Sequence, residues 1–436
     1  MIISSLHLLQ TPTYKIQLRQ CIHCGMCLQA CPTYNLFGTE MDSPRGRIAL
    51  IKAASDGRLS PVEFQHQFTQ HILLCLACRS CETACPSGVK YGKLIEEARF
   101  VVEHNRNTGL VEKFLRWMGV QQLMPRLGLL KTLAGILWLY EGSGLQSLIR
   151  RFKLLPPALS KFENILPPIS LNFLPRHPDI NQTNQQPNQV LFFSGCIQEA
   201  FLARVNQATV RVLNRNGYQV VTPSQQTCCG AAHLHLGDLE GAKQLARHNI
   251  DVFRSFTANG DYKIILCNAG GCGLSLKEYP GLLADDPVYY PMAVEFAKRV
   301  QDVSEFLFTH LTVLPQGMLK QRVVYTDSCH LRHGQKIIKQ PRQLLKKIPG
   351  LELIELSFPD RCCGSAGVYN LSQAETASAI LDAKIKDIAA KNPDLIVTTN
   401  TGCHMQLLAG VRKAGLSSRV MHIMEVIDLS YQTALQ

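Results

Sequence analysis

Two short segments of the chain each place four cysteines within eleven positions. The first, "CIHCGMCLQACP", contains Cys21, Cys24, Cys27 and Cys31, and the second, "CLACRSCETACP", contains Cys75, Cys78, Cys81 and Cys85. Thiols at this density serve a disulfide framework, a zinc site or an iron–sulfur cluster. The spacing between the cysteines distinguishes these three possibilities.

Both segments read C-x2-C-x2-C-x3-C-P, which is typical of proteins with two [4Fe–4S] clusters. A zinc site usually separates two C-x2-C pairs by about a dozen or more residues. In a cluster segment, the first three cysteines surround one cluster and the fourth binds the other. We therefore predict that cluster 1 is held by Cys21, Cys24, Cys27 and Cys85, and cluster 2 by Cys75, Cys78, Cys81 and Cys31. Structural zinc and free reactive thiols are the disfavoured alternatives.

Four charged residues lie in or near these segments. His23 and Arg79 lie between cysteines, and we predict solvated loop residues there, because the eight cysteines already complete both ligand sets. Arg45 and Arg47, in "SPRGR", are predicted either to offset cluster charge from a nearby helix start or to form an exposed basic turn.

A second cysteine pattern follows residue 195, where the sequence CCG occurs twice. The first copy contributes Cys196, Cys228, Cys229 and Cys272, and the second contributes Cys329, Cys362, Cys363 and Cys403. A disulfide between adjacent cysteines is strained, so each pair is better suited to converge with distant cysteines on a metal ion or cluster. A redox-inert structural fold is the alternative. Cys267 aligns with Thr398 of the second copy, which predicts a buried strand-end thiol rather than an essential ligand.

Five histidines lie near these later cysteines: His233, His235, His330, His404 and His422. An imidazole nitrogen could complete a metal shell at any of them. Each is nevertheless predicted to be a loop or core histidine rather than a ligand.

The second half of the chain is an internal duplication. "VLFFSGC" matches "VVYTDSC", "CCGAA" matches "CCGSA" and "NAGGC" matches "TNTGC", at offsets of 133, 134 and 131 residues. Short apolar strands ("VLFFSG", "YQVVTP", "YKIILC") alternate with helical stretches, which predicts βαβ units on a parallel sheet. The cysteines would then lie in strand-to-helix loops at one end of each sheet.

The first part of the chain is predicted to be all-helical, since segments 43–57 and 92–106 carry helix signals. Residues 127–140, "LGLLKTLAGILWLY", are too short to span a bilayer and are predicted to form a buried or docking helix rather than a membrane-surface anchor. We predict an α+β multidomain chain with these parts: a helical two-cluster ferredoxin domain (1–106), a helical arm with a Pro/Asn/Gln-rich linker (107–188), and two α/β repeats (189–312 and 320–436).

The composition restricts the class of protein further. The 436 residues are 46% hydrophobic, enough for a substantial core, and carry a formal net charge of +12. Two four-iron clusters at about −2 each would lower that charge to roughly +8. No nucleic-acid motif accompanies the basic residues, so we expect no nucleic-acid partner. The N-terminal "MIISSLHLLQTPTYK" does not read as a secretory signal, which predicts a reducing cytoplasm, where clustered cysteines more often hold metal.

The two repeats resemble the CCG domains found in heterodisulfide reductase (in its B-type polypeptide) and its relatives. This resemblance implies a non-cubane [4Fe–4S] cluster, or in some members zinc, in the CCG repeats. The pattern of that family ends in two closely spaced cysteines. Here four residues separate Cys267 from Cys272 in the first repeat, and the second repeat has Cys403 alone.

The whole chain resembles the iron–sulfur subunits of glycolate oxidase (glycolate dehydrogenase), most closely in "CIHCGMCLQACPTYNLFGTEMDSPRGRIALIK" and "CLACRSCETACPSGV". The resemblance implies an electron-transfer subunit of a membrane-associated 2-hydroxy acid dehydrogenase, on the inner face of the plasma membrane. Substrate oxidation needs a two-electron cofactor, and no G-x-G-x-x-G fingerprint occurs on a strand–helix turn. We therefore expect an FAD-binding flavoprotein partner, a membrane quinone as acceptor, and no catalytic residue in this chain.

Two other functions stay open at this stage. The first is a catalytic heterodisulfide or thiol reductase that works at a CCG cluster. The second is the iron–sulfur subunit of a lactate or glycerol-3-phosphate dehydrogenase, because sister families share the layout. A zinc-stabilised scaffold would be colourless, whereas iron–sulfur proteins are brown and absorb broadly near about 400 nm.

Overall fold

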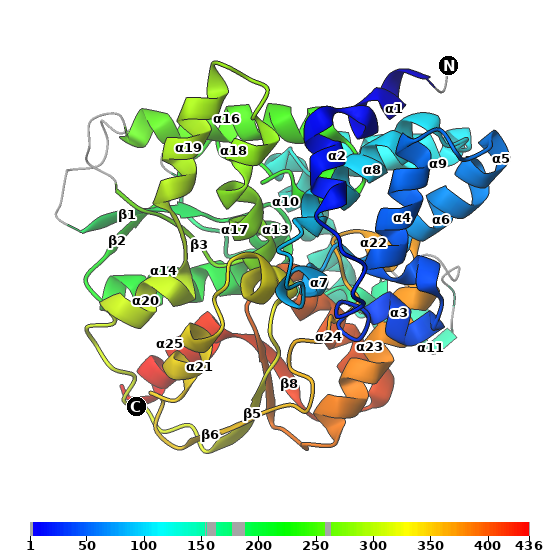
Figure 1. Cartoon of the computed structure of the whole chain (residues 1–436). Helices are drawn as coiled ribbons and strands as arrows, with labels where there is room; N and C mark the ends of the chain where they lie inside the picture. The colour runs from blue at the N-terminus through cyan, green and yellow to red at the C-terminus, as the bar shows by residue number, and fades with distance from the viewer. Residues whose placement is uncertain (1–2, 153, 155–162, 177–187, 258–262, 436) are drawn as a thin grey trace.

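The N-terminal part of the chain is a group of short helices, as the sequence predicts. The computed structural model describes residues 3–152, 154, 163–176, 188–257 and 263–435, and Figure 1 draws this helical part from blue to cyan. Its helices are α1 (Ile3–Gln10), α2 (Pro12–Arg19), α3 (Pro32–Phe37), the 3-10 turn η1 (Glu40–Asp42), α4 (Pro44–Ser55), α5 (Pro61–Glu63), the π-turn η2 (Phe64–Phe68), α6 (Thr69–Leu73), α7 (Ser80–Thr83) and α8 (Tyr91–Asn105).

Helix α4 begins at the start signal that the sequence carries. The Ser43 hydroxyl accepts a hydrogen bond from the Gly46 amide at 3.0 Å, and Pro44 occupies the first turn, where its missing N–H costs nothing. Fully buried Ile51, Phe68 and Leu94 form the centre of the core between α4, η2 and α8. This core fixes the helices from which both cysteine-rich loops extend.

A helical arm follows, made of α9 (Leu110–Arg116), the π-turn η3 (Trp117–Leu123), α10 (Leu127–Gly142) and α11 (Leu145–Phe152). Helix α10 buries Leu130 and Ala134 in the core of the first repeat, so one side of it docks as predicted. Its other side exposes Leu129, Ile136 and Leu139. Within the described ranges, no helix is both long and apolar enough to cross a membrane. Residues 177–187 of the predicted linker lie outside the described residues.

Each repeat contains a four-stranded parallel sheet, which confirms the predicted fold class. The strands are β1 (Gln189–Phe193), β2 (Gln219–Val221), β3 (Ile265–Cys267) and β4 (Val300–Asp302), then β5 (Gln321–Tyr325), β6 (Leu351–Ile354), β7 (Leu395–Thr398) and β8 (Arg419–His422). The sheet orders are β2-β1-β3-β4 and β6-β5-β7-β8, the same order in both repeats. The last strand of each repeat was not among the predicted strands.

Helices cover both sheets and join the repeats to each other. In the first repeat they are α13 (Ile197–Phe201), α14 (Ala203–Arg215), α15 (Ala231–His235), α16 (Leu239–Thr257), α17 (Gly270–Lys277), α18 (Tyr279–Leu282), α19 (Tyr289–Arg299) and α20 (Val303–His310). In the second they are the π-turn η5 (His330–Gly334), α21 (Lys339–Leu345), α22 (Tyr369–Ser372), α23 (Ala374–Ala389), α24 (Thr401–Ala414) and α25 (Ile423–Thr433).

The loops that follow β3 and β7 meet between the repeats. The Gly271 amide donates to the Asn400 side chain at 2.8 Å, and the Gly270 amide donates to the Thr399 carbonyl at 3.0 Å. Helix α14 packs along α25 on the same seam. The carboxyl ends of both sheets, where the cysteines lie, therefore face a shared interior.

Candidate metal centres

The first cysteine-rich loop and the last cysteine of the second line one cavity. Its lining includes the four cysteines predicted for cluster 1: Cys21, Cys24, Cys27 and Cys85. Cys24 is exposed and the other three are half-buried, so this cavity lies at the protein surface. Cys85 belongs to the second cysteine segment but lines the cavity of the first, which supports the predicted exchange of the fourth ligand between the two segments.

The second cavity is lined by the four cysteines predicted for cluster 2: Cys31, Cys75, Cys78 and Cys81. All four are buried. The Ala77 amide donates to the Cys75 sulfur at 3.3 Å, and the Tyr91 hydroxyl lies 3.8 Å from the same atom. Hydrogen bonds of this kind stabilise a metal-bound thiolate. The two sites thus differ in exposure although their motifs are alike.

The two loops share one backbone conformation. His23 and Gly25 flank the second cysteine of the first loop with φ of 54° and 83°, and Ala77 and Arg79 do so in the second with φ of 50° and 61°. The left-handed region costs a residue with a side chain about 1–2 kcal/mol. The loops are therefore held by contacts around them, such as the bond from Arg45 to the His23 carbonyl at 3.0 Å.

Arg45 and Arg47 point from the first turn of α4 to different cavities. Residues two apart on a helix point about 200° away from each other. Arg45 lines the first cavity and pairs with Glu40 at 2.6 Å. Arg47 lines the second cavity, where it is fully buried, and its guanidinium lies 3.9 Å from the Cys31 sulfur. Of the two predicted alternatives, the structure supports charge compensation for Arg47.

Arg47 has oxygen partners as well as cysteines around it, since its guanidinium lies 3.4 Å from the Asp42 carboxylate and donates to the Asp42 carbonyl at 2.6 Å. Burial alone would lower the pKa of its guanidinium, but the nearby groups Cys75 and Tyr91 raise that pKa overall. A cation placed in the first turn of a helix is opposed by the helix dipole. Two arginines in that turn are explained if each faces an anionic metal centre.

The prediction that Arg79 is a solvated loop residue is wrong. Its side chain is buried and forms an ion pair with Glu278, with one nitrogen–oxygen distance of 2.7 Å, and lies 3.5 Å from Glu96. Glu278 follows α17 of the first repeat, so Arg79 ties the second cysteine loop to that repeat. His23 is exposed, as predicted.

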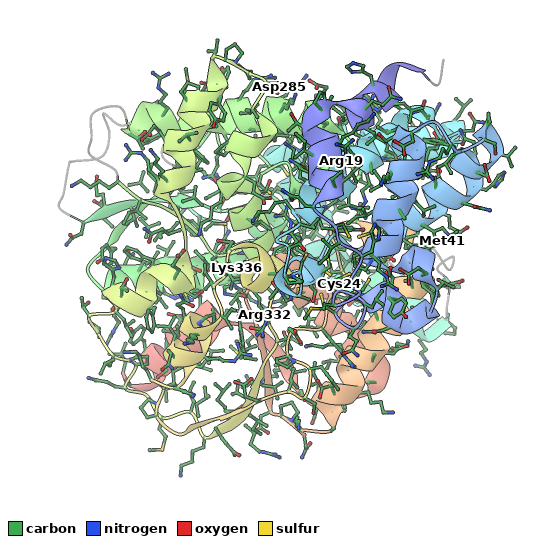
Figure 2. All side chains as sticks on the ribbon, in the orientation of Figure 1. Arg19, Cys24, Met41, Asp285, Arg332 and Lys336 are labelled. Atoms are coloured by element: carbon green, nitrogen blue, oxygen red, sulfur yellow. The ribbon has the colours of Figure 1, made fainter. Side chains whose placement is uncertain are left out.

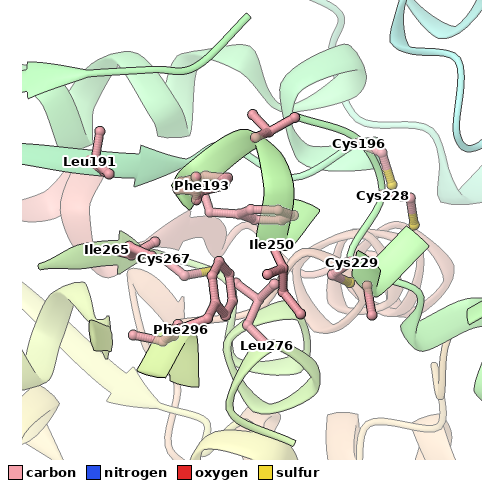
Figure 3. Close-up of a cluster of buried hydrophobic side chains, with 14 of the residues drawn as sticks. Leu191, Phe193, Cys196, Cys228, Cys229, Ile250, Ile265, Cys267, Leu276 and Phe296 are labelled. Atoms are coloured by element: carbon pink, nitrogen blue, oxygen red, sulfur yellow. The ribbon is translucent and has the colours of Figure 1, made fainter. Parts of the chain in front are cut away.

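In the first repeat, four cysteines converge from three loops. Cys196 ends the loop after β1, Cys228 and Cys229 precede α15, and Cys272 lies in α17. The four thiols lie close enough to influence one another: Cys228 raises the pKa of Cys196, and Cys228 and Cys272 raise the pKa of Cys229. Figure 3 shows the side chains of Cys196 and Cys228 next to each other at the edge of the apolar core.

The second repeat brings together the four equivalent cysteines. Cys329 is linked to Cys362, and Cys362 to Cys363. The Cys363 and Cys403 sulfurs lie 3.1 Å apart. Gly364 takes the same left-handed φ of 85° as Gly230 of the first repeat, as expected for the turn after each cysteine pair. Both repeats thus contain a four-cysteine site, and its role as a metal site stays a prediction.

Cys267 lies in a different environment from the four converging cysteines. It ends β3, is buried, and its sulfur contacts the Ala269 carbonyl at 3.5 Å. Figure 3 shows it among Ile265 and Phe296 in the apolar core. Burial raises the pKa of its thiol well above the usual value, as expected for a structural thiol.

Replacing Cys267 by threonine should therefore leave the metal content of the purified protein unchanged. Threonine is tolerated at the equivalent position of the second repeat, where Thr398 is fully buried. The matched variant Cys272→Ser should lower the metal content, measured by elemental analysis per chain. Equal losses from the two variants would show that the first repeat has a five-cysteine site.

The five histidines near these sites are buried or half-buried. Burial lowers the pKa of His330 and of His422 to about 4, so both rings are neutral near pH 7. His330 donates to the Ala77 carbonyl at 3.1 Å, and His422 contacts the Asn268 carbonyl at 2.8 Å. These rings fill structural roles, as predicted. His233 is also buried, and it is one of the groups that lower the pKa of Cys228, after Cys196 and Cys229.

The second cysteine loop packs directly on the cysteines of the second repeat. Leu76 and Cys78 belong to one buried apolar cluster with Cys362 and Tyr369, and Cys329 packs against it. Burial, followed by the charge of Cys329, raises the pKa of Cys78. The Tyr369 hydroxyl donates to the Leu74 carbonyl at 2.9 Å. No sequence signal indicated this contact, because both partners lie in unrelated motifs far apart in the chain.

The donor atoms fit iron–sulfur clusters. Burial raises the pKa of Cys78 and Cys81, and thiolates at such buried positions require a bound cation. Across the described part of the chain, no three His, Cys, Asp or Glu side chains are grouped around a single-ion site. The thiolates of a four-iron cluster bind separate irons, so they need not converge on one point. This arrangement favours clusters over zinc.

Family models match most of the chain. The model described as "4Fe-4S dicluster domain" matches residues 17–89, and the model described as "Cysteine-rich domain" matches 190–277 and 323–408. The model described as "Glycolate oxidase iron-sulfur subunit, linker region" matches 111–166. These matches confirm the prediction of [4Fe–4S] cofactors and of a duplicated cysteine-rich domain.

Several relatives match nearly end to end. The probable glycolate oxidase iron-sulfur subunit of Bacillus subtilis is 39% identical over 96% of this chain and 94% of its own length. The glycolate oxidase iron-sulfur subunit of Escherichia coli is 34% identical over 94% of this chain and 93% of its own. A fumarate reductase (CoM/CoB) polypeptide of Methanothermobacter marburgensis is 28% identical over 95% of this chain and 73% of its own.

Proposed function

Because the chain belongs to the family of glycolate oxidase iron–sulfur subunits, we propose that it is the electron-transfer subunit of a glycolate dehydrogenase complex. It would pass electrons from an FAD-binding flavoprotein subunit to the membrane quinone pool. The complex would lie peripherally on the inner, cytoplasmic face of the plasma membrane. The observation that supports a relay is the packing of Leu76 and Cys78 on Cys329 and Cys362, which joins the second cysteine loop to the second repeat.

We assign the eight cysteines of the two ferredoxin segments as cluster ligands in the crossed sets described above. When bound, [4Fe–4S] clusters supply one-electron redox chemistry. The chain's own side chains hold that charge in place, since Arg47 and the Tyr91 hydroxyl face the buried set and Arg45 faces the surface set. The eight cysteines of the CCG repeats would hold a further cluster or a metal ion.

Substrate oxidation is assigned to a partner rather than to this chain. Removing hydride from a 2-hydroxy acid needs a cofactor that takes two electrons together, which a flavin provides. The ferredoxin cysteines are instead arranged as two separate one-electron sites. Exposed Cys24 places one of these sites at the surface, within reach of a partner.

A thiol or heterodisulfide reductase is the second candidate. It is favoured by the adjacent pairs Cys228-Cys229 and Cys362-Cys363, because each pair lies beside a third cysteine; the Cys363 sulfur is 3.1 Å from the Cys403 sulfur, and Cys272 raises the pKa of Cys229. The similarity to a polypeptide of the fumarate reductase (CoM/CoB) points the same way. Such an enzyme would act on a disulfide without a flavoprotein partner.

Anaerobic titration of the purified complex with glycolate distinguishes the two candidates. We expect glycolate to bleach the flavin and then the broad iron–sulfur absorbance near about 400 nm. A quinone analogue should reoxidise both. If glycolate changes neither absorbance, while the isolated chain reduces a disulfide with a chemical reductant, the thiol reductase is the function.

A further inference from the structure

We propose that the exposed apolar surface around the first cysteine loop is the docking site for the flavin-bearing partner subunit. We use the name loop-1 patch for the exposed apolar side chains of this segment, Ile22 and Met26 in the loop itself and Leu36, Phe37 and Met41 in α3 and η1, which follow it directly in the chain. The inference rests on the proposed function and specifies where the partner binds. Figure 2 marks Cys24 and Met41 on the N-terminal part of the chain.

The patch surrounds the most accessible metal site of the chain. Ile22 is 67% exposed and Met26 62% exposed, and both lie between cysteines of the same loop. The structure describes all seventeen cysteines, and among them only Cys24 is exposed. Large apolar side chains that a loop exposes beside a functional site are typical of an interaction surface. Here that surface coincides with the point where an electron can enter the chain.

The second cysteine loop has the same motif as the first, but another part of the same chain covers it. Its positions equivalent to Ile22 and Met26 are Leu76 and Ser80, which are only 3% and 8% exposed. The second repeat supplies the cover, through the apolar cluster that contains Leu76 and Cys362. The second loop thus uses these positions to contact the cysteines of the second repeat, whereas the first loop leaves the equivalent positions exposed. By this internal comparison, the first loop is suited to meet a redox centre on another subunit.

A flavoprotein subunit fits the loop-1 patch better than a second copy of this chain. A symmetric dimer through this patch would place the same surface of both copies in contact. Both surface sites would then be enclosed, and neither could receive electrons. The exposed side chain of Arg19, two residues before Cys21, also gives the rim a positive charge. The partner should accordingly present an apolar surface with acidic residues at its edge.

Oxidative footprinting tests the contact without altering the protein. Met26 and Met318 are matched probes, because they are 62% and 57% exposed and lie in different parts of the chain. In the purified complex, the oxidation rate of Met26 should fall by about fivefold or more relative to the isolated chain, since an interface core excludes water. Met318 should react equally in both. The proposal would be overturned if Met26 were oxidised at the same rate in the complex and in the isolated chain. It would also be overturned if a higher concentration of the isolated chain protected Met26, because the contact would then be between two copies of this chain.

A charge substitution provides the second test. Ile22→Glu should reduce the FAD that co-purifies with the tagged chain by about tenfold or more, because a carboxylate would be buried unpaired at the contact. Val62→Glu is the matched control, since Val62 is 68% exposed on α5, at the outer end of the same helical part (Figure 1). Iron content should stay equal in both variants.

The outcomes separate this proposal from the proposed function. If the wild-type chain co-purifies with no flavoprotein, both are overturned. If FAD is present in the wild type and Ile22→Glu retains it as Val62→Glu does, the docking site lies elsewhere. In that case the electron-transfer function still stands.

Discussion

Replacing Cys24 by serine should stop electrons from leaving the glycolate dehydrogenase complex while flavin reduction continues. Cys24 is the exposed member of the surface set of cysteines, and its loss should empty the site that faces the partner. Glycolate should still bleach the flavin, since the proposed function assigns substrate oxidation to another subunit. Quinone reduction should fall by about 100-fold or more, which corresponds to about 2.7 kcal/mol in the activation barrier.

This measurement needs two controls because Cys24 lies between Ile22 and Met26 of the loop-1 patch. The FAD content per chain must match the wild type, so that loss of the partner is not mistaken for loss of the relay. Cys267→Thr serves as the control for removing a cysteine, because Cys267 lies in the apolar core of the first repeat. Quinone reduction that persists with the surface site empty would show that this chain is not the relay.

Replacing Cys85 by serine should remove the cluster held by the first segment, although Cys85 belongs to the second. The reason is that Cys85 lines the same cavity as Cys21, Cys24 and Cys27. We expect a loss of about four iron atoms per chain. Paramagnetic resonance of the reduced protein should show which of the two cluster signals disappears.

Cys31→Ser is the reciprocal variant and should remove the other signal. Cys31 lines the buried cavity with Cys75, Cys78 and Cys81. Its loss should also destabilise the protein more than the loss of Cys85, because a buried site would be left without its cofactor. If each variant instead lost the signal of its own segment, the ligands would not be exchanged.

The sequence was sufficient to predict which cysteines line each of the two cavities, because the motif that carries this information is local. Cysteines at steps of three predict a loop that surrounds one cluster, and this prediction does not depend on the fold of the rest of the chain. The duplication likewise revealed two parallel sheets, since matching apolar runs preceded matching cysteines. The strands β4 and β8 were not predicted, because their sequences "VQD" and "RVMH" are short and partly polar. They are strands only because a neighbouring strand pairs with them.

The docking of the two halves could not be predicted. Ile22 and Leu76 are both apolar and occupy the same motif position, yet one is exposed and the other buried. The difference comes from the second repeat, whose Cys362 and Tyr369 pack on Leu76. His330 of that repeat also bonds to Ala77, 253 positions away in the chain. Arg79 was misjudged for the same reason, since its partner Glu278 lies 199 positions away. Local motifs carry no information about such distant partners.

The burial of the second cysteine set has a consequence for how the protein is made. Cys31, Cys75, Cys78 and Cys81 lie beneath a loop that the C-terminal repeat covers through Leu76 and Tyr369. Iron and sulfide must therefore reach these thiols before the last quarter of the chain closes over them, or that closure must reverse. The surface set has no such constraint and can be filled or repaired in the finished protein. If the eight cysteines hold the proposed clusters and the closure does not reverse, the interior centre is filled first.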